Sequence, residues 1–337
     1  MIRRLGLAAL LFLLSFAARA QFDYAAFGTL DLSYGRFENS GADPRHRWNS
    51  NSLSASFVGA RASYGFENGL TAGINLETFI RFEELDYGRN EQDPFLSRNN
   101  FVSLQHNDYG LLRLGRMQTP LFETSIRFNA FGDSAGFSPA LRQIFLSGNL
   151  ESIDGDFYWD RAVSYKTPQF EDLNLQGHLM YAQGSGDNRG DYFGGSAVYS
   201  RGVFALSFVA QNVHVNNGID DEIDEMTLQV GGAYNFGVAR LFGQYTHVDD
   251  KGNDTKNKLA TAGVSVPLGP GTVLAQIARS TAKGPAVDRK HTTTSLGYVY
   301  NYEGLADFYV MAMDVRVSNQ TRGVSYAAGV RYQFSVP

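Results

Sequence analysis

Apolar and polar side chains alternate with a period of two along most of this chain, from about residue 22 onward. In residues 225–236 the even positions carry Met, Leu, Val, Gly, Tyr and Phe, whereas the odd positions carry small or polar residues. Residues 323–334 and 70–83 repeat this pattern, and no stretch beyond residue 21 keeps helical spacing. Because successive side chains of a strand point to opposite faces, each segment predicts a β-strand with one apolar and one polar face.

Sixteen such segments lie between breaks, and all nine prolines fall in the breaks or at the terminus, where a residue without an N–H leaves the strand ladder intact. The predicted strands are residues 22–36, 51–66, 70–85, 98–106, 111–118, 157–167, 173–183, 191–200, 203–215, 225–236, 238–248, 258–266, 272–282, 291–301, 305–317 and 323–334. Short breaks such as 67–69 alternate with long ones such as 37–50, 86–97 and 119–157. An even number of strands joined in this way predicts an up-and-down antiparallel sheet.

Two architectures can hold this pattern, a soluble sandwich and a membrane barrel. Segments of roughly nine to fifteen residues exceed the five or six residues typical of soluble strands. Tyr and Phe gather at segment ends, as in residues 298–302 and 332–334, which is typical of the aromatic girdles of barrels. We therefore predict an all-β fold, a 16-stranded antiparallel transmembrane β-barrel formed by residues 21–337, with the apolar face toward lipid and the polar face toward water.

Residues 1–20 carry a different pattern. Arg3 and Arg4 precede an apolar run over residues 5–18, and Ala18-Arg19-Ala20 has the spacing of small residues found at a cleavage site. The run is shorter than the ~20 residues that a membrane-spanning helix needs. This order of features predicts a cleaved secretory signal peptide and hence an exported protein.

Composition narrows the classes of function. The 337-residue chain has no Cys, which excludes disulfides and thiolate chemistry. Its formal charge is -5, and 26 basic residues stand against 34 acidic ones once residues 1–20 are removed, which disfavours nucleic acid as a partner. The acidic run 220–225 offers oxygen ligands that Ca²⁺ or Mg²⁺ could use, but a solvated loop tip is the preferred interpretation. We predict no metal and no cofactor.

Several stretches resemble the Gram-negative general porins, particularly those of the β-proteobacterial type. Residues 27–31 (FGTLD) resemble the first strand of that family, residues 69–77 the third strand, and residues 101–104 with 108–116 (DYGLLRLGR) the hairpin that leads into the third loop. Residues 162–168 (AVSYKTP) resemble the strand that follows. The resemblance spans the predicted mature chain.

The resemblance implies a homotrimeric, water-filled channel in the outer membrane of a Gram-negative bacterium, surrounded by lipid and lipopolysaccharide. Ions and small hydrophilic solutes would diffuse through it passively, and a long third loop, about residues 119–157, would fold inward and narrow it. The family often carries Arg where this chain has Phe57, and Asn where it has Arg161. The charge layout of the pore would therefore differ from that of a typical member.

A constriction with acidic residues on the loop and basic residues on the facing wall creates a transverse electric field that selects polar solutes. The candidate acids are Glu123 and Asp133. The candidate bases, which lie on early strands that face the loop in the family, are Arg61, Arg81, Arg98 and Arg113. Arg116, at the junction of strand and loop, is predicted to anchor the loop, and Arg127 and Arg142 could neutralise its acids.

Alternative functions remain open. A substrate-specific channel for sugars or organic acids would bind its solute saturably, with Phe79, Phe131 and Phe137 as an aromatic track. A barrel with a plugged lumen would conduct nothing. Residues 132–136 fit the Gly-x-Ser-x-Gly pattern of hydrolases, but that chemistry needs a strand, a helix and a converging His and acid around Ser134. The six His are scattered singly, so we predict no enzyme.

Overall fold

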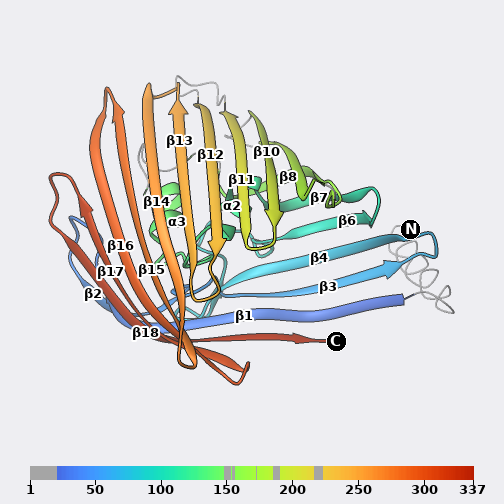
Figure 1. Ribbon diagram of the computed structural model, residues 1–337, viewed down its shortest axis with the longest axis horizontal. Coiled ribbons are helices and arrows are strands. Elements are labelled where there is room, and N and C mark those ends of the chain that lie inside the picture. The colour runs from blue at the N-terminus through green and yellow to red at the C-terminus, as the bar shows by residue number, and fades with distance from the viewer. Residues whose placement is uncertain (1–20, 148–152, 154–155, 172, 185–189, 216–222) are drawn as a thin grey trace.

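Strands make up most of the described chain in the computed structural model, and they run side by side around a common interior (Figure 1). The structure describes residues 21–147, 153, 156–171, 173–184, 190–215 and 223–337. The predicted signal peptide, residues 1–20, and part of the acidic run, residues 220–222, lie outside the described residues.

One antiparallel sheet of eighteen strands contains all the strands of the described chain, and two of these, β2 (Arg45–Ser50) and β5 (Asp86–Tyr87), are short. The others are β1 (Gln21–Phe37), β3 (Phe57–Gly65), β4 (Leu70–Arg81), β6 (Asn100–His106), β7 (Gly110–Gln118), β8 (Tyr158–Lys166), β9 (Leu175–Gln183), β10 (Gly190–Arg201), β11 (Phe204–Val215), β12 (Ile223–Asn235), β13 (Arg240–Asp250), β14 (Thr255–Leu268), β15 (Gly271–Gly284), β16 (Val287–Tyr302), β17 (Ala306–Val317) and β18 (Gly323–Val336). Each of these sixteen pairs with the next along the chain. The pairing of β1 with β18 closes the sheet, which confirms the predicted 16-stranded barrel.

The first long break differs from the prediction. Residues 37–50 contain β2, which folds back along the end of β1 with Leu32 opposite Ser50. Residues 51–56, predicted as the start of a strand, are irregular instead. The carboxylate of Asp31 accepts hydrogen bonds from the backbone N–H groups of Ser52 (2.8 Å) and Leu53 (3.3 Å), so the chain turns inward there and the strand begins only at Phe57.

The alternation of the sequence divides the residues between the two faces of the wall. On β11, Leu206 and Phe208 expose 43% and 53% of their surface, whereas Ser207 and Val209 are buried. The outward face continues as an apolar belt around the barrel, with Ile74, Leu104, Leu114, Val163, Leu179, Phe193, Val230, Leu296, Val310 and Val330 exposed. The inward face carries buried polar side chains such as Gln211, Gln229 and Thr246. This division is the one that the alternation predicts.

The two ends of the barrel differ in their connections. Both β1 and β18 have their free ends on one side (Figure 1), where the turns are short, such as residues 202–203 and 269–270. We call this the short-turn end. The opposite, long-loop end carries residues 38–56 and 82–99, and there β7 ends at Gln118 and β8 begins at Tyr158.

Residues 119–147, the inner segment, lie inside the barrel. They contain α2 (Pro120–Arg127), α3 (Pro139–Leu141) and the π-helical turn η1 (Arg142–Leu146). The Thr124 hydroxyl contacts the side-chain oxygen of Gln229 on β12 (3.3 Å), and the Gln143 amide donates to Thr293 on β16 (3.0 Å). Since these partners belong to the inward face, the segment crosses the interior rather than the outer surface.

The sequence pattern did not predict α2, although its start carries a signal. Thr119 caps the helix, because its hydroxyl accepts a hydrogen bond from the N–H of Phe122 (3.1 Å), and Pro120 occupies the first helical position. Within the described part of the chain, no helix is long and apolar enough to cross a membrane.

Candidate functional site

Glu123 fixes α2 to one side of the interior. Its carboxylate lies 2.7 Å from the amino group of Lys166, 3.3 Å from His178 and 3.6 Å from Arg113. The hydroxyl of Ser164 joins the cluster, 3.0 Å from Arg113 and 2.7 Å from His178. Burial opposes ionisation, but contact with His178 and the charges of Lys166 and Arg113 lower the pKa of Glu123 to about 2. The helix is therefore held by an ionised carboxylate against β7, β8 and β9.

Arg98 and Asp133 lie on different sides of a gap beside the inner segment. Arg98 forms an ion pair with Glu77 of β4, and its guanidinium lies 3.8 Å from the ring centre of Phe57. Burial raises the pKa of Asp133, while the positive charges of Arg98 and Arg331 oppose this rise. Arg98 thus has its own acidic partner, and Asp133 has two cations in its surroundings.

The other predicted residues lie elsewhere. Arg81 pairs with Glu84 and Asp86 of its own turn, at 2.5 and 3.0 Å. Arg61 is exposed on β3, and no carboxylate of the described chain lies within 4.0 Å of it. Arg113 and Glu123 are therefore in contact, whereas Arg98 and Asp133 line the same cavity without forming an ion pair, and Arg61 and Arg81 join neither group. The contribution of all six to ion selection stays a prediction.

Arg116 lies where the chain returns from the inner segment to the wall. Its guanidinium is 2.9 Å from Asp160 and 3.6 Å from Asp156, and it donates to the carbonyl of Ser97 (2.9 Å). These contacts join β7, which precedes the inner segment, to residues 156 and 160, which follow it, and to Ser97 of the loop 82–99. This geometry suits the predicted role of Arg116 as the anchor of the third loop.

A cavity of about 220 Å³ fills the gap between the inner segment and the wall. Aromatic rings line much of it, those of Phe79, Phe122, Phe145, Phe157 and Tyr158, and Arg98 and Asp133 reach it as well. Of the three aromatic residues predicted to form a track, Phe79 alone lines this cavity. Phe131 and Phe137 are buried in a separate cluster with Leu53 and Tyr309.

Ser134 holds the tip of the inner segment. It is fully buried, and its hydroxyl donates to the carbonyl of Ser52 and accepts from the N–H of Phe137 (2.9 Å). No described histidine is within hydrogen-bonding distance of Ser134. The serine of the Gly-x-Ser-x-Gly match therefore has a structural role, hydrogen bonding to the backbone, and is not a nucleophile.

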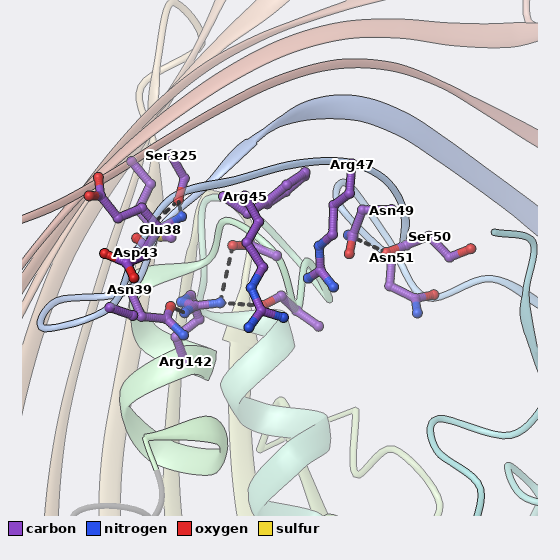
Figure 2. A pocket seen from close by; sticks show the side chains of 15 residues that line it. Glu38, Asn39, Asp43, Arg45, Arg47, Asn49, Ser50, Asn51, Arg142 and Ser325 are labelled. Atoms are coloured by element: carbon purple, nitrogen blue, oxygen red, sulfur yellow. Dashed lines mark hydrogen bonds between the residues drawn. The ribbon is translucent and has the colours of Figure 1, made fainter. Parts of the chain in front are cut away.

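A second cavity, of about 560 Å³, opens at the long-loop end and was not predicted. Arg45 and Arg47 of β2 and Arg142 of η1 line it (Figure 2). Arg142 does not neutralise an acid of its loop: it donates to the carbonyls of Ala135 and Gly136 and to the side chain of Asn39. The spacing of Arg45 and Arg47, two residues apart, is the available sequence signal, but the alternation pattern predicts only a long break over residues 37–50.

A closed barrel that is apolar outside and polar inside, with a segment folded across its interior, defines an outer-membrane channel. Comparison with known proteins agrees: the chain matches the Gram-negative porin family over residues 6–320 and belongs to that family. Outer membrane porin protein 32 of Delftia acidovorans is 30% identical over 331 residues, which cover 94% of this chain and 91% of the relative.

Solved structures show the same fold. The anion-selective porin from Comamonas acidovorans is 24% identical, with a TM-score of 0.79, and the match covers 93% of this chain and all of that one. A trimer form of OmpT from Vibrio cholerae is 16% identical, with a TM-score of 0.69 and coverage of 94% and 99%. The protein is thus an outer-membrane porin of a Gram-negative bacterium and not an enzyme. In such barrels the long loops are extracellular and the short turns periplasmic.

Proposed function

We propose that this porin is a passive diffusion channel for ions and small hydrophilic solutes, narrowed by the inner segment. The observation that carries the proposal is the position of α2. Glu123 holds this helix against β7, β8 and β9, while a gap remains toward β4 and the irregular residues before β3. Sixteen strands enclose an aqueous lumen, so a segment folded into that lumen sets its effective width.

The charges at the gap support only weak ion selection there. Two arginines line the gap, and both are paired: Arg98 with Glu77, and Arg89 with Asp93 and Asp156. Neither guanidinium therefore presents an unbalanced charge to a passing ion. Asp133 is half-buried beside two cations. The Comamonas relative is an anion-selective porin, and we infer that any anion preference of this chain arises mainly outside the gap.

A substrate-specific channel is the second candidate, and one observation favours it. The gap is lined by five aromatic rings, with Phe79 and Tyr158 in an edge-to-face contact at 5.6 Å. Aromatic surfaces of this kind bind planar or amphipathic solutes. Such a channel would pass its preferred solute at a rate that saturates with concentration.

The remaining partners follow from the outer surface. The apolar belt fits the hydrocarbon layer, with lipopolysaccharide around the long-loop end. We infer a homotrimer, as for the Vibrio relative with its trimer form. Unheated electrophoresis of the folded protein would show a band of about three chains, converted to one chain on boiling.

Recording from the refolded protein in planar bilayers tests the function. We expect stepwise currents, and fluxes of small sugars into proteoliposomes that rise linearly with concentration. Saturation with an aromatic acid, and not with a sugar of similar size, would favour the substrate-specific channel instead. Absence of steps from a folded protein would contradict both.

Arg98→Gln and Arg81→Gln form a matched pair at the gap. Arg98→Gln leaves Glu77 without its partner beside the gap, so we expect the reversal potential in a salt gradient to shift toward cations. Arg81→Gln removes the same charge from a side chain held by Glu84 and Asp86 away from the cavity, and a smaller shift is expected. Equal shifts would contradict the assignment of Arg98 to the gap.

A further inference from the structure

Three guanidinium groups share the cavity at the long-loop end. Arg45 and Arg47 lie two residues apart on β2, so both side chains point to the same face of that strand. Arg142 reaches the cavity from the inner segment on the other side, and Figure 2 shows the three guanidinium groups one after another along it. Groups of one charge gathered from two elements repel each other unless an anion lies among them.

The acidic residues of this cavity do not compensate these charges. Glu38 is occupied, because it pairs with Arg36 at 2.7 Å and accepts from the N–H of Val324 at 2.8 Å. Asp43 is exposed, and no ion pair joins it to any cation of the described chain. Likewise, no carboxylate among the described residues lies within 4.0 Å of the three arginines.

Arg142 is held in place without an acidic partner. One of its terminal nitrogens lies 3.4–3.5 Å from the carbonyls of Gly136 and Ala135, and the other is 2.7 Å from the Asn39 side-chain oxygen. Burial lowers the pKa of this guanidinium below its ordinary value, because no nearby carboxylate offsets the loss of water. Neutral oxygens thus orient the Arg142 guanidinium, and its positive charge stays available to a bound anion.

The cavity lies next to the gap. Asn51 and Ala135 line both this cavity and the aromatic one beside the inner segment. A solute bound among the arginines would therefore be adjacent to the narrow part of the lumen, on its extracellular side.

We propose that Arg45, Arg47 and Arg142 form a binding site for a multivalent oxyanion, one that carries two or more carboxylate, phosphate or sulfate groups. A guanidinium presents a planar fork of N–H donors that matches these groups bidentately. The volume of about 560 Å³ admits such a solute together with water. A monovalent anion would bind one guanidinium group at a time and therefore bind more weakly. The site lies outside the gap and does not depend on diffusion through it.

Calorimetric titration of the folded, detergent-solubilised protein with citrate tests the proposal. At low ionic strength, where screening is weak, we expect saturable binding with one site per chain and much weaker binding of acetate. Replacing Arg45, Arg47 and Arg142 together by Gln should weaken citrate binding roughly ten-fold or more. Asp43→Asn removes a negative charge from the same cavity and should tighten binding, the opposite sign.

Arg201→Gln is the matched control, because it removes one positive charge from an exposed position at the short-turn end. Its citrate affinity should equal that of the unmodified protein. The proposal is overturned if the triple variant binds citrate as tightly as the parent, if Arg201→Gln weakens binding to the same degree, or if the parent shows no saturable binding. Should the triple variant fail to fold, the double variant Arg45→Gln/Arg47→Gln, with both side chains exposed, replaces it.

A bilayer measurement separates this inference from the proposed diffusion function. Citrate on the long-loop side should reduce the chloride current of the parent saturably and that of the triple variant much less. A folded protein that binds citrate but carries no current would contradict the diffusion function and leave the anion site standing. Normal currents without citrate binding would contradict the site alone.

Discussion

Glu123 shows how a single carboxylate can position a helix inside a water-filled barrel. It is the only acid of the described residues within 4.0 Å of Lys166, His178 and Arg113, which come from three neighbouring strands. Glu123 and Lys166 keep about a quarter of their side-chain surface exposed, at 23% and 24%. Solvent therefore screens the cluster, and its net contribution is below that of a fully buried ion pair.

Glu123→Gln should reduce the free energy of unfolding by about 1–3 kcal/mol at pH 7, because three cationic or polar partners lose their acid. The pKa of this carboxyl falls from 4.5 to about 2 on folding. The stabilisation is thus fully present above about pH 4.5 and is lost as the pH falls toward 2. Denaturant titrations of both proteins between pH 7 and 2 measure this. Glu67→Gln, on an exposed turn, is the control, and a difference independent of pH would contradict the assignment.

Ser134→Ala separates a structural serine from a catalytic one. The substitution leaves the Ser52 carbonyl and the Phe137 N–H without their buried partner, and we expect a loss of about 1–3 kcal/mol in unfolding free energy. Single-channel current should persist, since the fold is kept. Denaturant titration together with bilayer recording checks both outcomes. A variant with an unchanged free energy of unfolding would show that the hydrogen bonds of the Ser134 hydroxyl do not stabilise the fold.

At the scale of elements, the sequence pattern identifies every wall strand but not the elements within the loops. Strands follow from alternation because one face meets lipid and the other meets water or the inner segment. β2 and α2 have no such constraint, since both lie in mixed surroundings at the long-loop end and in the lumen. The ends of strands also depend on tertiary contacts, as the hydrogen bonds of Asp31 with residues 52 and 53 show.

The candidate site was predictable only in part, for a related reason. Residue type and position identified Glu123, Asp133, Arg98 and Arg113 as lumen candidates. Their pairing depends on distances between elements far apart in sequence, and alternation carries no information about these. Glu77, the ion-pair partner of Arg98, belongs to a strand that resembles the family, but the sequence does not indicate that it neutralises an arginine.

Replacing residues 121–146 by a short Gly/Ser linker should raise the single-channel conductance by about two-fold or more, because an unobstructed sixteen-stranded barrel holds a wide aqueous lumen. Replacing residues 251–254, a turn at the long-loop end, by Gly and Ser is the control and should leave conductance near that of the parent. Conductance steps in bilayers give the measurement. An unchanged conductance in the folded deletion variant would show that the inner segment does not limit flow.

At the scale of the whole molecule, the apolar belt and the polar interior exchange the usual places of core and surface. Outward Leu, Val and Phe side chains are exposed in the isolated chain because lipid is their solvent, and the packing core lies instead between the inner segment and the wall. A charged residue introduced on the outer face should then lower the stability of the protein in a bilayer, and more so the closer that residue lies to the middle of the membrane.

Phe208→Arg tests this dependence on depth. Phe208 is exposed on the outward face of β11, and an arginine there should cost about 2–4 kcal/mol near the middle of the bilayer. Val238→Arg, on a short turn and 78% exposed, should cost little. Unfolding titrations in lipid vesicles measure both. Equal costs at the two positions would contradict the assignment of β11 to the lipid-facing wall.

The closure of the barrel has a consequence for how the chain reaches its native state. The seam between β1 and β18 joins Ala26 to Val336 and Arg36 to Tyr326, contacts separated by nearly the whole length of the chain. Such contacts form slowly, since a large loss of chain entropy precedes them. Until the seam forms, β1 and the last available strand remain open edges that can pair with other chains. We therefore expect folding to be limited by this final pairing, and the unclosed sheet to be the species most prone to aggregation.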